Sequence, residues 1–228
     1  MQTTSNPEFV TGIFKKELKN RFLCEVQING RDVVCYVPSS CHLSNFLQLE
    51  GEKVLLVPTQ TPNSRTPFAV FAVPYKKNYI VLNTSMANRA VEASLTSRRF
   101  CFLGKRLDAI KEHTVCGYKT DLFLPSSNTI VEIKSVISTS EIATFPTVFS
   151  ERSLKQLKKL GDLLDQGYQC LFAIVSLNPY VKEIRVDTAS LLYEELKKCV
   201  DKGLVLKSYT CKLCDYKLQI DKQIPLLI

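Results

Sequence analysis

The apolar residues of this 228-residue chain change their spacing near residue 84, and that change constrains the fold more than any other feature. Before it, short apolar runs alternate with polar or proline-bearing segments, a pattern typical of β-strands joined by turns. After it, longer segments place apolar residues three and four positions apart, which is typical of helices. The sequence therefore predicts an all-β unit at residues 1–83, followed by a mixed α/β unit at residues 84–228.

Five short strands are expected in the first unit. Two β-rich runs flank Asn29-Gly30, a dipeptide that strongly favours a two-residue hairpin turn. Three more strands are predicted at 53–58, 68–74 and 79–83. Five strands fit a small barrel such as the OB-fold, which binds oligonucleotides, but strand count alone does not distinguish it from an SH3-like barrel.

The second unit is predicted to mix helices and strands. Ser85 is the expected N-cap of a helix at 84–98, and a basic helix is expected from about residue 150 to a stop near Gly167. A continuous apolar run predicts a strand buried on both faces. The expected elements after residue 98 are a hairpin at 119–136, a helix at 150–165, the buried strand at 170–177, a helix at 188–201 and a last strand at 204–213.

Composition limits the possible binding partners and the cellular compartment. The net charge of +8 favours a polyanionic partner such as nucleic acid, although a modest basic excess can also serve only solubility. No segment is apolar enough to span a bilayer and no secretory signal is visible, so we expect a cytoplasmic protein without a membrane partner. Nine scattered cysteines agree with that compartment. The pair Cys211 and Cys214 forms the C-x-x-C motif, but with no second pair nearby a zinc site is not expected.

The hairpin at 119–136 carries the candidate chemistry. Asp121 lies on its first strand, and Glu132, Ile133 and Lys134 lie on its second. Since side chains alternate along a strand, Glu132 and Lys134 share one face, and pairing across the turn can bring Asp121 near them. Two carboxylates and the Ile133 carbonyl can hold Mg²⁺ or Mn²⁺, with Lys134 beside the attacking water. The alternative is an ordinary amphipathic hairpin whose charged residues face water.

Several segments, in this order, are similar to the sugar fermentation stimulation protein A (SfsA) family: RFLCEV, NTSMANRAVEASL, VEIKSV, FPTVFSERSLKQLKKL and IPLLI. The resemblance covers nearly the whole chain from about residue 21. It implies an OB-like N-terminal barrel and a C-terminal domain of the PD-(D/E)xK restriction-endonuclease-like fold. It also implies a DNA-binding protein linked to regulation of sugar metabolism, for which a nuclease role is inferred.

By position, the resemblance assigns catalytic roles to Asp121, Glu132 and Lys134, and more loosely to Glu112. The chain departs from the family pattern around that site. Thr147 stands where the family has an aspartate, Gln156 where it has a histidine, and Ser153 where it has a glycine. The family glycine of an N-terminal loop is replaced by Cys41. These changes weigh more against nuclease activity than against the fold.

Residues that could contact nucleic acid are spread over both units. Positions at the start of the basic helix could meet a phosphate or could form a solvated face. Phe22 and Tyr36 could stack on bases or pack in the core. The candidate contacts are Arg21, Arg65, Asn88, Arg89, Arg152, Lys155 and Gln156.

Three functions are therefore open. The first is a DNA-binding protein with a metal-dependent nuclease site, and the second is a DNA-binding or regulatory protein in which the nuclease fold is inert. The third is a protein-interaction domain whose basic charge is incidental.

Overall fold

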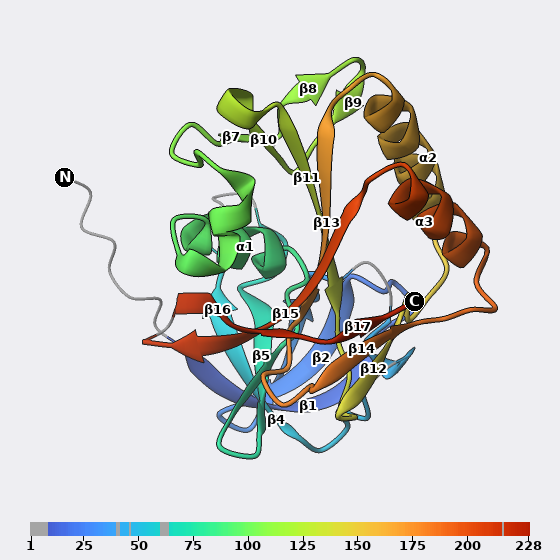
Figure 1. The fold of residues 1–228 in the computed structure, drawn as a ribbon. Helices are drawn as coiled ribbons and strands as arrows, with labels where there is room; N and C mark the ends of the chain where they lie inside the picture. Colours follow the sequence, from blue (N-terminus) through green and yellow to red (C-terminus); the bar gives the residue numbers. More distant parts are fainter. Residues whose placement is uncertain (1–8, 40–41, 46, 60–63, 216) are drawn as a thin grey trace.

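The computed structural model describes residues 9–39, 42–45, 47–59, 64–215 and 217–228. Figure 1 shows a β-barrel at one end and a long sheet rising from it, flanked by helices. Residue Cys41, noted above as a departure from the family pattern, lies outside the described residues.

The barrel is a closed ring of five strands, as the OB-fold requires. Its strand order is β3-β2-β1-β4-β5, and a parallel pairing between β3 and β5 closes the ring, with β6 added as a hairpin partner of β5. Asn29 and Gly30 both have positive φ, 50° and 79°, so the predicted two-residue turn is confirmed. The strands are β1 (Val10–Glu17), β2 (Leu23–Ile28), β3 (Arg31–Tyr36), β4 (Lys53–Pro58), β5 (Phe68–Tyr75) and β6 (Asn78–Val81).

The composition of the ring differs from the expectation in one strand. The sequence prediction began at residue 21 and therefore missed β1, while it counted the strand at 79–83, observed as β6, as part of the five. Gly12 interrupts the apolar alternation of β1. A Cβ at Gly12 would lie 2.4 Å from Val26 Cγ1, so the close approach of β1 and β2 requires a glycine here. This glycine breaks the apolar pattern from which β1 could have been predicted.

The second unit is built on a six-stranded sheet of order β16-β15-β13-β11-β10-β7. The three central strands β11, β13 and β15 run parallel, and the remaining pairings are antiparallel. The predicted buried strand is confirmed as β13, which is buried on both faces. The sheet strands are β7 (Ile110–Lys111), β10 (Leu122–Leu124), β11 (Thr129–Val136), β13 (Gln169–Ser176), β15 (Val205–Cys214) and β16 (Lys217–Ile224).

Helices cover both faces of this sheet (Figure 1). Helices α2 and α3 pack on the face that presents Ile130 and Phe172, whereas α1 and the barrel pack on the face that presents Val131 and Leu171. The three helices are α1 (Met86–Ser94), α2 (Glu151–Asp165) and α3 (Leu191–Asp201), and short 3₁₀ turns are η1 (Leu43–Asn45), η2 (Arg98–Leu103) and η3 (Pro125–Ser127). No helix of the described residues is both long and apolar enough to cross a membrane.

Two small sheets complete the unit. One has the order β12-β14-β17, and the other pairs β8 with β9. Their strands are β12 (Ile142–Phe145), β14 (Glu183–Val186), β17 (Leu226–Leu227), β8 (Thr114–Val115) and β9 (Tyr118–Lys119).

The two units share one hydrophobic core. The larger buried cluster runs without a break from the barrel through α1 to one face of the sheet. A backbone hydrogen bond of 3.1 Å from Val81 N–H to the Leu177 carbonyl joins β6 to the end of β13. Burial of a common apolar surface therefore fixes the barrel against the sheet.

The helix N-termini differ in how they are capped. Ser85 is the N-cap residue of α1, as predicted, but its side chain makes no capping hydrogen bond, because its hydroxyl donates to Asn83 Oδ1 at 2.7 Å. In α2, by contrast, the Ser150 side chain does cap the helix, accepting from the Ser153 N–H at 3.3 Å. The Ser150 cap therefore fixes where helix α2 begins.

Candidate active site

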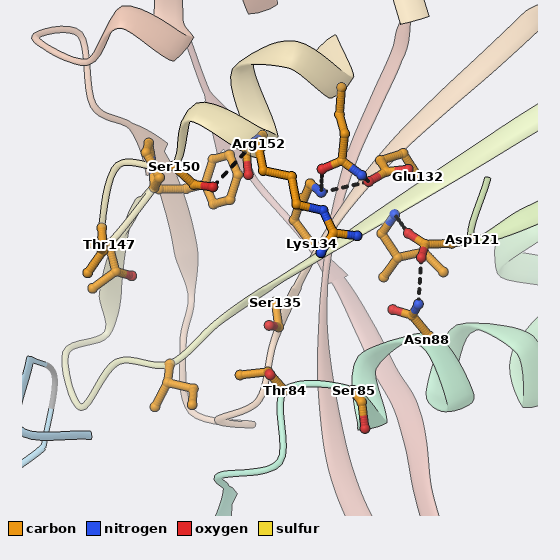
Figure 2. A pocket seen from close by; sticks show the side chains of 17 residues that line it. Thr84, Ser85, Asn88, Asp121, Glu132, Lys134, Ser135, Thr147, Ser150 and Arg152 are labelled. Carbon is orange, nitrogen blue, oxygen red and sulfur yellow. Dashed lines mark hydrogen bonds and ion pairs between the residues drawn. The ribbon is translucent and has the colours of Figure 1, made fainter. Parts of the chain in front are cut away.

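A cavity of about 360 Å³ lies where β11 passes between α1 and the start of α2. Figure 2 shows its walls, with Asp121 and Asn88 on one side and Arg152 on the other. Its polar lining residues are Thr84, Ser85, Asn88, Asp121, Glu132, Lys134, Ser135, Thr147, Ser150, Arg152, Ser153 and Gln156.

The hairpin register brings the two acids together. Leu122 pairs with Val131, so Asp121, the residue just before β10, lies opposite Glu132. Asp121 Oδ2 accepts the Ile133 N–H at 2.7 Å, and Oδ1 accepts from Asn88 Nδ2 at 2.8 Å. The Asp121 carboxylate therefore takes the place of a backbone carbonyl as the partner of the Ile133 N–H at the end of β10. Its bond to Asn88 also links the sheet to α1.

Glu132 is held by three donors. Its Oε1 accepts from Lys134 Nζ at 2.6 Å and from Gln156 Nε2 at 2.8 Å, and its Oε2 accepts from the Tyr118 hydroxyl. Gln156 Oε1 also accepts from Lys134 Nζ at 2.7 Å, which closes a three-residue ring. The position of Lys134 is thus fixed by Glu132 on the same strand and by Gln156 on helix α2.

The hypothesis of a hairpin with a wet charged face is wrong for Glu132, whose exposed fraction is only 1%. Val131 and Ile133 face the core as expected. Both faces of β11 are covered, one by α1 and the barrel and the other by α2 and α3, so its acid is enclosed with polar partners.

Burial raises the pKa of two side chains at this site, Asp121 and Tyr118. The pKa of Asp121 is raised from 3.8 to about 6, first by burial and then by the negative charge of Glu132. The Ile133 N–H, Lys134 and Asn88 oppose that increase. The Tyr118 hydroxyl has its pKa raised by burial and by Glu132, so it stays protonated and donates.

The donor set fits a hard divalent cation. An ionised carboxylate offers about four lone-pair sites, and hydrogen bonds occupy two on Asp121 and three on Glu132. Among the described residues, no cluster of three or more His, Cys, Asp or Glu side chains is placed to hold a metal. Mg²⁺ is commonly held by one or two carboxylates with waters and substrate phosphate as its other ligands, so two acids suffice.

A free cation also faces the cavity. The Arg152 side chain, in the first turn of α2, points into it (Figure 2) and makes no hydrogen bond or ion pair with any described residue. The N-terminus of α2, where the helix dipole is positive, opens on the same space. Both features favour an anionic ligand beside the two acids.

Other predicted residues lie elsewhere. The Glu112 carboxylate is exposed and pairs with Lys119 Nζ at 2.6 Å, so it does not line the cavity, and its pKa is lowered by that partner. Lys155 lines a neighbouring hollow with Tyr118, Arg152 and Gln156. Arg89 lines a separate cavity, while Arg21 and Arg65 are exposed on the barrel unit.

Asn88 and Gln156 have positioning contacts that the sequence did not indicate. Both were expected to touch nucleic acid, whereas the structure places them against Asp121 and against Glu132 and Lys134. Tyr118 was missed altogether. No local pattern identifies it, because it reaches Glu132 only through the pairing of separate strands.

Phe22 and Tyr36 form an exposed aromatic pair on the barrel. Their exposed fractions are 37% and 40%, so they do not pack in the core. Their rings are stacked with centroids 6.4 Å apart, and the Arg21 guanidinium lies 4.8 Å from the Phe22 ring centre. This surface can stack on a nucleobase.

The C-x-x-C motif has no metal-site geometry in the described residues. Cys211 is buried in β15, donates to the Ser176 carbonyl at 3.2 Å, and has its pKa raised by burial. Cys214 is half-buried near the strand end. Both thiols are free.

Two family models match the chain. Residues 18–82 match the SfsA N-terminal OB domain, and residues 85–217 match the sugar fermentation stimulation protein RE domain. A sugar fermentation stimulation protein homolog of Natranaerobius thermophilus is 26% identical over 226 residues, which are 95% of this chain and 93% of the relative. The homolog of Pseudoalteromonas atlantica is 24% identical and covers 96% of this chain and 97% of its own.

A solved structure has the same fold. SfsA of Pyrococcus furiosus, solved in complex with Ca²⁺, superposes with a TM-score of 0.83 at 17% identity. The match covers 97% of this chain and 96% of that one. Both units, and their arrangement, are therefore those of a known architecture.

Proposed function

The chain belongs to the sugar fermentation stimulation (SfsA) family, and from that premise we propose that it binds DNA and cleaves phosphodiester bonds with a divalent cation, Mg²⁺ or Mn²⁺. The observation that carries the proposal is the convergence of Asp121, Glu132 and Lys134 in one cavity. Such a combination of two acids and a lysine suits metal-dependent hydrolysis.

Asp121 and Glu132 would hold the cation, with the carbonyl of Ile133 as a third oxygen ligand. The raised pKa of Asp121 supports this role, because a cation between the acids relieves the repulsion that Glu132 contributes. The bound cation supplies Lewis-acid chemistry, lowering the pKa of a water ligand and polarising the phosphate. The Ca²⁺ complex of the Pyrococcus furiosus protein is consistent with a cation site in this fold.

Lys134 is placed to stabilise charge that develops on the phosphate. Its ammonium is held by Glu132 and Gln156, so no large reorganisation is needed when the substrate arrives. Arg152 and the N-terminus of α2 would bind the phosphate from the opposite wall. These groups bind and orient the scissile phosphate between the acids and α2.

The aromatic pair on the barrel offers a path for the polymer. Tyr36 ends β3, and two residues later the Pro38 carbonyl accepts from the N–H of Thr84, a cavity-lining residue, at 3.3 Å. Two residues span at most about 7 Å of chain, so stacked bases could lead directly to the cavity rim. A single-stranded segment fits this arrangement because its bases are free to stack.

The catalytically inert DNA-binding protein stays as an alternative, supported by a specific observation. Glu132 already accepts three hydrogen bonds, so little of its carboxylate is available to a cation. Thr147, at the cavity edge, cannot replace the acid that the family pattern has there.

Cleavage of end-labelled single- and double-stranded DNA, with Mn²⁺ or with chelator, tests the proposal. We expect cutting only with the cation, and a loss of about 10²-fold or more in Asp121→Asn, Glu132→Gln and Lys134→Met, with DNA binding retained. Glu141→Gln is the matched control, because Glu141 is an exposed acid paired with Lys182.

The outcomes separate the alternatives. Binding without cutting under either cation would favour the inert DNA-binding protein. Absence of binding at low salt would contradict both functions. Wild-type cutting by all three cavity variants would show that the active site lies elsewhere.

A further inference from the structure

A second cavity, of about 760 Å³, lies on a different face of α1 from the candidate active site. Met86, Arg89 and Ala93, three and four residues apart, line it together, while Asn88 faces the first cavity. Its other walls come from β4 and β5 of the barrel, from the segment around Ser97, and from β16. It is therefore a junction of the two units that the proposed chemistry does not use.

The charged side chains of this cavity are all cationic. Arg89, Arg99 and Lys217 line it, and no Asp or Glu does so among the described residues. The side chains of Arg89 and Lys217 make no ion pair or hydrogen bond with a described residue, and the Arg99 side chain donates to the Asp221 carbonyl. The nearby Asp221 carboxylate is already paired with Lys212 at 2.9 Å. No acidic side chain of the described residues therefore neutralises these cations inside the cavity, which favours an anionic ligand.

The remaining walls are largely apolar. Val57, Phe71, Met86, Leu218 and Ile220 supply hydrocarbon and aromatic surface, and the polar residues Asn83 and Gln219 line the same cavity. The volume falls in the range of small-molecule sites, which combine apolar walls with a few convergent polar groups. A bare phosphate would leave most of this surface in contact with water.

We propose that this cavity binds a small phosphate-bearing ligand with a flat aromatic ring, of the nucleoside monophosphate class. The phosphate lies against Arg89, Arg99 and Lys217, and the ring lies against the wall formed by Phe71 and Met86. The amides of Asn83 and Gln219 serve the polar edge of the ring. This site is independent of phosphodiester cleavage, because a different set of residues forms it.

Calorimetric titration with adenosine 5′-monophosphate, in chelator and low salt, tests the site. We expect saturable one-to-one binding to the full chain, and inorganic phosphate should bind at least about tenfold more weakly because it lacks the ring. Arg89→Gln and Lys217→Gln should each weaken the nucleotide roughly tenfold or more. Both side chains are exposed, so thermal unfolding midpoints should stay close to wild type.

Arg98→Gln is the matched control, since Arg98 is exposed, adjacent to Arg99 and outside the cavity lining. It should bind the nucleotide like wild type. Absence of saturable binding, or equal binding by Arg89→Gln, Lys217→Gln and wild type, would overturn the proposal. It would also be overturned if these two variants weaken a single-stranded oligonucleotide but not the mononucleotide, because the surface would then belong to a polymer path.

Discussion

Asp121 and Glu132 lie opposite each other in one hairpin but have different partners. Glu132 accepts from three side chains, including Lys134, whereas Asp121 accepts from one backbone N–H and one amide. The pKa of Asp121 is raised to about 6, first by burial and then by the negative charge of Glu132. A buried acid with a raised pKa lowers the stability of the folded protein at neutral pH, because folding disfavours its charged form.

The pH dependence of stability follows from that shift. The pKa of Asp121 is higher in the folded chain than its ordinary value of 3.8, so the folded state binds more protons between about pH 4 and 6. The contribution of this group to the free energy of unfolding is therefore greatest below pH 4. It falls as the pH rises through 6, by at most roughly 3 kcal/mol.

Asp121→Asn removes this titration. In chelator, we expect the variant to gain stability relative to wild type as the pH rises from 4 to 7, as measured by urea denaturation at each pH. A difference between the two proteins that stays constant over this range would contradict the assignment. The comparison cancels the titration of groups remote from Asp121, because both chains share them.

Local sequence was sufficient to predict some of the site residues but not others. Asp121, Glu132 and Lys134 lie in one hairpin, so strand alternation and a single turn already bring them together. Tyr118, Asn88 and Gln156 reach the site from β9, α1 and α2. Their contacts depend on how these elements pack, which no short spacing encodes.

At the scale of elements, helix α2 depends on its N-cap. Ser150 accepts from the Ser153 N–H, and the same helix carries Arg152 and Gln156 into the cavity. Ser150→Ala should lower the free energy of unfolding by about 1 kcal/mol, because a backbone donor then loses its partner. Urea denaturation with an unchanged slope would measure this effect.

Ser153→Ala provides the matched control for that helix. No hydrogen bond of the Ser153 hydroxyl to a described residue is found, and alanine favours helix, so we expect a change within about 0.5 kcal/mol. Equal destabilisation by the two substitutions would contradict a capping role for Ser150.

The predictability of the elements varied with their environment. Helix α2 and strand β13 have clear apolar periodicity because each buries a defined surface. Strands β1 and β16 were missed, since β1 contains Gly12 at a close strand approach and β16 alternates buried with polar residues near a chain end. Closure of the barrel by β3 and β5 is a long-range pairing and leaves no local signal.

At the scale of the whole molecule, the net charge of +8 implies salt-dependent binding to nucleic acid. The Arg152 side chain lines the cavity and pairs with no described residue, so Arg152→Gln should reduce the slope of log K against log salt by roughly 1. Fluorescence anisotropy with a single-stranded oligonucleotide between low and moderate salt measures this slope.

Lys182→Gln is the control for that slope, because Lys182 is exposed and pairs with Glu141 at 2.8 Å, outside the cavity lining. Its slope should equal that of wild type. An unchanged slope for Arg152→Gln would mean that α2 does not contact a phosphate and that the polymer follows another surface.

The central claim is that Asp121 and Glu132 form a cation site, and the most direct test is anomalous scattering from crystals grown with Mn²⁺. The account predicts a peak between the two carboxylates and near the Ile133 carbonyl, and no such peak in Asp121→Asn crystals. An ordered cavity without a peak, or a peak only at another place in the molecule, would contradict the claim.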